Sequence, residues 1–437
     1  MARAADKRRN RHTNTHPPNS RSTGYAALSS QNFRLYLIGQ AVATTGTWVQ
    51  RIAQDWLVLT LTGSATMVGI TTALQWAPML IFGLFGGWIA DHYPKRRVLQ
   101  TTQLAACTTA TLLAGLTLTH HVTAWHVQAL AAVTGTIIAI ERPVRQALVT
   151  DIVERSQIHG AISLTYAVYF LGNFSGPALA GVLISVAGPG WAYALNAASY
   201  IAPLTAIAWI DPNRFPPHEA ANRRTTPPGE TVRPLLTRPE IWQPSALCGV
   251  FAMFISNLPV ILTTEARTTH IGPTGYSVLA SSIALGSLAG GIIAAGRTHI
   301  GLGALVVTGY ALSAALMLAS AMSPLWGLSC ALALVGAVST ILFTGTSAHV
   351  QLVAERSVRG RVTSIYNIAE TGSAALGGPI LGLIVENCGP RTGLTLAGAI
   401  PAAAVLLIAT LSLASKALRS RLAGQGPDRR SRCPTGR

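Results

Sequence analysis

Residues 83–97 read Gly-Leu-Phe-Gly-Gly-Trp-Ile-Ala-Asp-His-Tyr-Pro-Lys-Arg-Arg, an apolar run with three glycines that ends in an acid, a short turn and a basic cluster. The acid is Asp91, and the bases are Lys95, Arg96 and Arg97. A second long apolar run starts directly after them. Short basic loops between apolar runs are typical of the cytoplasmic side of membrane proteins, where Lys and Arg accumulate. This stretch therefore predicts a cytoplasmic turn between two membrane spans.

Twelve apolar runs of spanning length surround and include these two, so the sequence predicts an all-α membrane protein with twelve transmembrane helices. We expect the spans at 34–60, 66–90, 98–119, 124–141, 158–186, 190–210, 241–265, 274–296, 302–321, 325–347, 361–386 and 391–415. The longest internal polar stretch, rich in Pro and Arg, separates six spans from six. The expected units are a disordered basic tail (1–30), an N-terminal half (31–210), a cytoplasmic linker (211–240), a C-terminal half (241–415) and a second basic tail (416–437).

Positive charge is divided unevenly between the two sides that these spans define. Of the 32 Lys and Arg residues, all but Arg51, Arg267 and Arg391 fall in the tails and in alternate loops. This asymmetry predicts a multi-pass protein of the cytoplasmic (inner) membrane with both termini in the cytoplasm. The net charge of +17 is spread over short loops, so we assign it to topology and to contact with the lipid bilayer rather than to nucleic acid.

The second half repeats features of the first in the same order. Residues of the fifth span recur in the eleventh at one constant separation: Gly160, Tyr166 and Gly172 correspond to Gly360, Tyr366 and Gly372. Parallel repeats that face each other across a central cavity are the architecture of rocker-type secondary transporters. We therefore expect two pseudo-symmetric six-helix halves in a monomer.

The loop after the second span resembles that of the major facilitator superfamily. The family signature there is Gly, three residues, Asp and a base, with further bases after a short turn; Gly87, Asp91, Lys95, Arg96 and Arg97 match it, and His92 replaces the first base. The resemblance implies a cytoplasmic gate in which the acid engages basic groups and a neighbouring helix N-terminus when that side is shut. An ordinary positive-inside loop is the alternative.

The fifth span resembles the antiporter motif of the same superfamily. Gly172, Gly176, Pro177 and Gly181 match it, and Ala180 replaces one glycine of its final pair. The resemblance implies export rather than import. The alternative is a structural Gly-Pro kink, since proline removes a helix hydrogen bond and small residues let a partner helix approach.

The first span is the most polar, and it carries the candidate residues Arg51, Gln54 and Asp55. Residues 47–64 resemble the transmembrane secretion effector branch, with its enterobactin-type siderophore exporters and macrolide or drug exporters; the resemblance extends over 31–415. Asp55 follows Arg51 by one helical turn, so the two share a helix face. The carboxyl is either part of the transport site or an interfacial acid paired with Arg51.

Glu370 lies near the middle of the eleventh span, beside Tyr366 and Asn367, and Asn173 lies in the fifth. A carboxylate at membrane depth is costly unless it is paired, hydrated or protonated. We therefore predict a role for Glu370 in proton exchange or substrate binding, with the two asparagines and the tyrosine as further candidates. The alternative is a packed glutamate bonded to a neighbouring Asn or Tyr.

Several function classes are excluded by what the chain lacks. No Lys follows a glycine, so a phosphate-binding Gly-Lys-Ser/Thr loop is absent, and the five cysteines have no metal spacing. The histidines lie mostly at span ends without paired acids, which disfavours a membrane-embedded transferase. We predict no enzyme and no cofactor, but a secondary active exporter of a small amphipathic molecule (drug, antibiotic or siderophore-like), driven by protons through alternating access. An importer or uniporter of the same fold is the alternative.

Overall fold

The computed structural model describes residues 26–211, 238–295, 301–323, 325–354 and 359–424. Most of the predicted linker and most of both predicted tails therefore lie outside the described residues. Within these ranges the regular structure is helical and contains no strand. The expectation of an all-α membrane protein is confirmed by this architecture, which includes helices long and apolar enough to span a membrane.

The helices of the first half are α1 (Gln31–Thr62), α2 (Ala65–His92), α3 (Lys95–Leu118), α4 (Ala124–Asp151), α5 (Ile158–Ala187), α6 (Pro189–Ser199) and α7 (Ile201–Trp209). Those of the second half are α9 (Pro239–Ile255), α10 (Leu258–Thr268), α11 (Gly272–Ala295), α12 (Leu302–Ala321), α13 (Leu325–Val353), α14 (Arg359–Cys388) and α15 (Pro390–Gly424). The sixth and seventh predicted spans are each divided into two helices. Pro203 and Pro259 follow the two breaks, and proline cannot donate to the carbonyl one turn earlier.

The fourth predicted span ends too early, because α4 continues through Pro143 to Asp151. Glu141, at the predicted end, and Arg145, in the extra turns, form an ion pair at 3.5 Å one helical turn apart. Hydropathy marks such charges as the end of a span. Here they lie on a face of α4 that packs against other helices of the first half, and the Glu141 side chain is buried.

Nine helical segments among the described residues are long and apolar enough to cross a membrane. The helices α1 and α3 are long enough but more polar, and α6 and α7 are each short. The count of twelve crossings therefore stays a prediction, whereas the multi-pass character of the protein does not depend on it.

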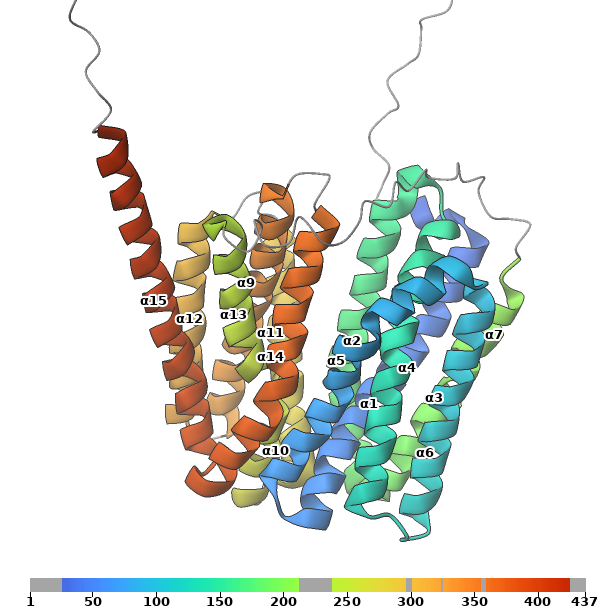
Figure 1. Ribbon diagram of the computed structural model, residues 1–437. Coiled ribbons are helices and arrows are strands. Elements are labelled where there is room, and N and C mark those ends of the chain that lie inside the picture. The colour runs from blue at the N-terminus through green and yellow to red at the C-terminus, as the bar shows by residue number, and fades with distance from the viewer. Residues whose placement is uncertain (1–25, 212–237, 296–300, 324, 355–358, 425–437) are drawn as a thin grey trace, which may run out of the picture.

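The two halves repeat the same packing scheme, as expected from the sequence. In the first half α1 packs on α5, α2 on α4 and α3 on α6; in the second half α9 packs on α14, α11 on α13 and α12 on α15. Figure 1 shows the two groups of helices side by side. They meet through α2 with α14 and through α5 with α11.

The bundle has two unlike ends. We call the end that carries the α1–α2 turn at Gly63 and the α14–α15 turn at Gly389 the hairpin end, and the opposite end, which carries Tyr93 and Ile152, the terminal end. Figure 1 shows the two groups of helices close together at the hairpin end and diverging toward the terminal end. The backbones approach so closely near the hairpin end that a Cβ on Gly378 would lie 2.3 Å from the Gly69 carbonyl oxygen.

Candidate transport site

A cationic side chain, Arg51 of α1, lies in the first half close to two indole rings. Its guanidinium carbon is 5.2 Å from the centroid of the Trp48 ring and 5.3 Å from that of Trp76 on α2. Its Nε donates a hydrogen bond to Oε1 of Gln75 at 3.1 Å. Cation–π contacts of this kind contribute about 0.5–2 kcal/mol each, with the larger values where water is excluded. The two rings and the amide hold the guanidinium in one orientation.

Two glutamines connect this guanidinium to the neighbouring helices. Nε2 of Gln75 donates to Oε1 of Gln54 at 3.3 Å, and Nε2 of Gln54 donates to the Val127 carbonyl of α4 at 3.4 Å. The chain of amides therefore ties α1 to α2 and α4. Of the residues predicted from the sequence, Arg51 and Gln54 are brought into one polar cluster.

The Asp55 carboxylate connects the two halves rather than pairing with Arg51. It accepts a hydrogen bond at 2.8 Å from the hydroxyl of Tyr276 on α11, and the residue is only 2% exposed. Among the described residues it forms no ion pair with Arg51, although the two lie one turn apart on α1. The interfacial ion pair that the sequence left open is therefore not present. The sequence offered no signal for Tyr276, which lies 221 residues away along the chain.

Glu370 lies on α14, in the second half, and is half-buried. The Arg142 guanidinium of α4 acts on it electrostatically from the first half. Tyr366, one turn earlier, is 3% exposed and its hydroxyl donates to the Phe343 carbonyl at 3.1 Å, so it holds α14 against α13. Among the described side chains none hydrogen-bonds to the Glu370 carboxyl. The alternative of a packed glutamate bonded to a neighbouring Asn or Tyr is therefore not observed.

The two asparagines do not join either cluster. Asn173 is half-buried on α5 and Asn367 is exposed on α14. Within the described ranges neither side chain makes a hydrogen bond that would assign it to the polar cluster of Arg51. The same ranges contain no group of three His, Cys, Asp or Glu side chains that could hold a metal ion.

The glycines of the fifth span let α5 approach two different helices. A Cβ on Gly172 would lie 2.7 Å from Cγ2 of Thr44, and one on Gly176 would lie 2.3 Å from Cβ of Trp48, both on α1. A Cβ on Gly181 would lie 2.5 Å from Cβ of Ser277 on α11, in the other half. Pro177 is buried inside the helix. The motif therefore packs α5 against its own half and also against the opposite one.

The basic loop at the terminal end makes contacts within the first half. Lys95 forms an ion pair with Asp151 of α4, and Arg96 donates to the Ala208 carbonyl of α7. Asp91 and Arg97 are exposed. A Cβ on Gly87 would meet no described atom within 4 Å, so this face of α2 is not covered. The gate role of the loop stays a prediction.

The α1–α2 turn is held by two charged side chains of the second half. Glu386 of α14 accepts from the Ser64 hydroxyl at 2.7 Å and from the Thr66 backbone N–H at 3.0 Å, at the start of α2. Arg267 of α10 donates to the Leu59 carbonyl at the end of α1. An anion thus lies at a helix N-terminus and a cation at a helix C-terminus, the favourable arrangement for both helix dipoles. The role of Glu386 was not predicted from the sequence.

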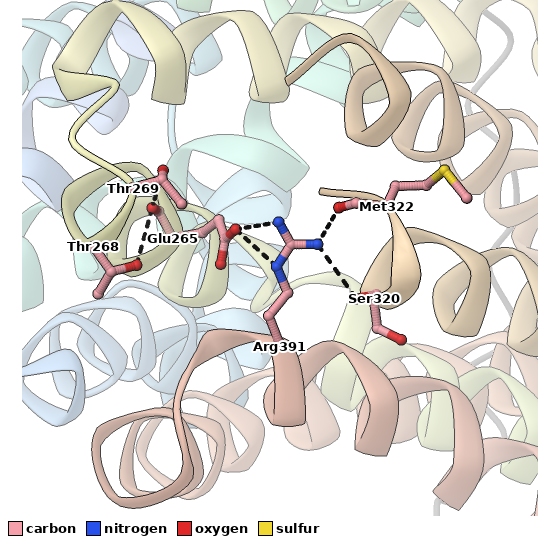
Figure 2. A network of polar contacts seen from close by, with 6 residues as sticks. All are labelled: Glu265, Thr268, Thr269, Ser320, Met322 and Arg391. Carbon is pink, nitrogen blue, oxygen red and sulfur yellow. Dashed lines mark hydrogen bonds and ion pairs between the residues drawn. The ribbon is translucent and has the colours of Figure 1, made fainter. Parts of the chain in front are cut away.

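A second polar network lies at the hairpin end but entirely within the second half (Figure 2). Nε of Arg391 on α15 donates to Oε1 of Glu265 on α10 at 2.8 Å. Its Nη1 donates to the carbonyls of Ser320 and Met322 at the end of α12. Glu265 is 2% exposed, whereas the Arg391 side chain remains 33% exposed. This network joins three helices of the second half.

Sequence comparison places this architecture in a family. The profile of the transmembrane secretion effector family matches residues 22–426. The enterobactin exporter EntS of Citrobacter koseri is 23% identical over 356 residues, which cover 80% of this chain and 84% of the relative. The staphyloferrin A transporter of Staphylococcus aureus is 30% identical over 160 residues, 36% of this chain and 38% of the relative. The multidrug efflux pump Tap of Mycolicibacterium fortuitum is 28% identical over 160 residues, 35% and 39% of the two chains.

Solved structures share the fold at low identity. A bacterial homolog of the human lysosomal transporter Spinster, inward-facing and occupied, superposes with a TM-score of 0.64 at 13% identity, over 90% of this chain and 97% of the other. A bacterial homologue of the iron transporter ferroportin, in an inward-facing state, gives 0.64 at 12% identity, over 86% and 98%. The chain therefore belongs to the transmembrane secretion effector family of the major facilitator superfamily, and it is a multi-pass membrane transporter of small molecules, not an enzyme.

Proposed function

We propose that this transporter exports a small amphipathic molecule from the cytoplasm across the cytoplasmic membrane, in exchange for protons, by alternating access. In this proposal the terminal end faces the cytoplasm, because the bases Lys95, Arg96 and Arg97 lie there. The arrangement described above is then the cytoplasm-open state, with the hairpin end closed.

The observation that carries the proposal is the contrast along α2 in how closely it approaches the second half. Near the hairpin end a Cβ on Gly69 would lie 2.1 Å from the Gly378 carbonyl oxygen, so α2 and α14 are in backbone contact. Near the terminal end a Cβ on Gly83 or Gly87 would meet no described atom within 4 Å. These two glycines lie one turn apart on one face of α2. An uncovered glycine face on a membrane helix is suited to close packing against another helix in a different state.

Export is supported by two relatives, an enterobactin exporter and a multidrug efflux pump, and by the Gly-Pro motif of α5. Proton exchange is supported by Glu370, a half-buried acid of α14. The positive charge of Arg142 on α4 interacts with its carboxyl across the two halves. A carboxyl at membrane depth that alternates between ionised and protonated forms supplies a coupling site.

The proposal is tested by uptake of candidate compounds into inverted membrane vesicles, with and without a proton gradient. Intact protein is compared with Glu370→Gln and Asp55→Asn, and with Glu154→Gln as a control, because Glu154 is an exposed acid outside the predicted spans. We expect gradient-driven uptake by the intact protein and the control, and its loss in Glu370→Gln. Gradient-driven uptake that persists unchanged in both test variants would mean that neither carboxyl couples transport to protons. Accumulation only in right-side-out vesicles would favour an importer.

A further inference from the structure

The guanidinium of Arg51 keeps its hydrogen-bonding edge available. The rings of Trp48 and Trp76 lie within 5.3 Å of its carbon, and only Nε is used, by Gln75. Among the described residues, neither terminal nitrogen has a hydrogen-bond partner or a carboxylate within ion-pair distance. The residue is only partly buried. Cation–π contacts cover the faces of a guanidinium, whereas its in-plane N–H groups form the fork that binds a carboxylate.

The acid best placed to neutralise Arg51 is engaged elsewhere. Asp55 lies one turn after Arg51, a spacing at which opposite charges on a helix meet. Its carboxylate instead accepts the hydrogen bond of Tyr276 from the second half. Arg51 and Asp55 still act on each other electrostatically, but among the described residues no carboxylate is in contact with the guanidinium. A cation in a membrane protein with no anion in contact is suited to bind one.

Resting on the proposed function, we propose that Arg51 is the anion-binding group of the transport site and that the substrate class is an organic anion, a carboxylate or comparable oxyanion on a flat apolar body. The anion oxygens accept hydrogen bonds from the free guanidinium edge, and the apolar body contacts the neighbouring indoles. Asp55 is the competitor of this anion. While Tyr276 holds Asp55, the anion occupies Arg51; when the hairpin end opens, Asp55 is released, pairs with Arg51 and displaces the anion outward.

The experiment measures equilibrium binding of three probes with the same ring system to the full-length protein in detergent by calorimetric titration. The probes are 2-naphthoate, the uncharged 2-naphthamide and the cationic 2-naphthylmethylamine. We expect the intact protein to bind the naphthoate about tenfold more tightly than the amide, a difference of one hydrogen-bonded charge pair. Arg51→Gln removes this preference, and Arg51→Lys keeps part of it. Equal affinity for all three probes, or a preference that survives Arg51→Gln, overturns the proposal.

The role of Asp55 has a separate signature. Tyr276→Phe removes only the hydroxyl and is expected to weaken naphthoate binding several-fold, because Asp55 then competes for Arg51. Adding Asp55→Asn to Tyr276→Phe restores the affinity of the intact protein, and naphthamide binding stays constant throughout. A purely structural role would lower the affinity for both probes and would not be rescued. Unchanged naphthoate binding in Tyr276→Phe overturns Asp55 as the competitor. Binding needs no proton gradient, so a failure of export in vesicles contradicts the proposed function alone.

Discussion

The two ends of the bundle hold their charged residues in different ways. At the hairpin end, Glu386 and Arg267 reach from the second half to the α1–α2 turn, and Tyr276 reaches to Asp55. At the terminal end, Lys95 and Arg96 bond to other helices of their own half. A charged loop therefore does not by itself join the two halves. Its contacts depend on which end of the bundle is closed.

A second contrast separates contacts between the halves from contacts within one. The Glu265–Arg391 network lies at the same end as the Glu386 contacts but binds only helices of the second half. We expect the network within one half to determine folding stability and the contacts between halves to determine the balance of conformations. Three changes test this division, and a fourth tests the opposite end of the bundle.

The largest effect is expected from Glu265→Gln, which leaves the positive charge of Arg391 beside neutral carbonyls. Removing one partner of a buried ion pair lowers the free energy of unfolding by about 3 kcal/mol or more. We expect the smaller value here, because the Arg391 side chain is 33% exposed. Thermal unfolding in detergent should show a clear loss of stability. Arg267→Gln, at the same end but between the halves, is the matched control and should leave the unfolding temperature nearly unchanged. Equal losses in the two variants would contradict the division.

The next effect is expected from Gly378→Ala, where the new Cβ would lie 2.3 Å from the Gly69 carbonyl oxygen. Overpacking at this contact destabilises the hairpin-closed form by about 2 kcal/mol, which lowers the ratio of hairpin-closed to hairpin-open molecules about thirtyfold. Distances between spin labels at Leu61 and Asn387, both exposed at the hairpin end, would report it. Gly87→Ala, on the helix that carries Gly69, is the control, because a Cβ on Gly87 would meet no described atom within 4 Å. A distance distribution that stays the same in Gly378→Ala would show that this contact does not hold the end closed.

A smaller effect is expected from Asp91→Asn, which concerns the closed form of the terminal end. If Asp91 stabilises that form by about 1 kcal/mol, as an acid near bases and a helix start can, turnover falls about fivefold. Substrate binding in the terminal-open form should be unaffected. The measurement is the initial export rate in vesicles beside the affinity in detergent. A variant that loses affinity and rate equally would place Asp91 in binding rather than gating.

The fold was predictable because each membrane helix must satisfy its own backbone and present apolar side chains to lipid. Hydropathy and the alternation of Lys and Arg follow from that requirement and locate the helices. The end of α4 was missed because Glu141 and Arg145 face protein rather than lipid, a distinction that hydropathy does not contain. The breaks after Ser199 and Ile255 had a visible cause in the prolines that follow them.

The site was predictable only where its members are neighbours in the chain. Arg51, Gln54 and Asp55 share a helix, and their spacing indicated a polar cluster. The partner of Asp55 lies 221 residues away, and the hydroxyl of Ser64 lies 322 residues from its partner Glu386. No helical period connects residues at such separations, and their pairing depends on how the halves meet. The structure supplies that arrangement.

The smallest effect is expected from Glu386→Gln, which removes a negative charge from the N-terminus of α2 but keeps an acceptor for Ser64 and Thr66. An exposed charge at a helix end contributes about 0.5 kcal/mol, so the ratio of closed to open hairpin ends should fall about twofold. High salt should reduce the difference between the variant and the intact protein, because salt screens an exposed charge but not the glycine contact. The same spin-label distances measure it, with Glu154→Gln as the control for loss of one exposed acid. A shift as large as that of Gly378→Ala, or one that does not respond to salt, would mean that Glu386 acts through packing rather than through its charge.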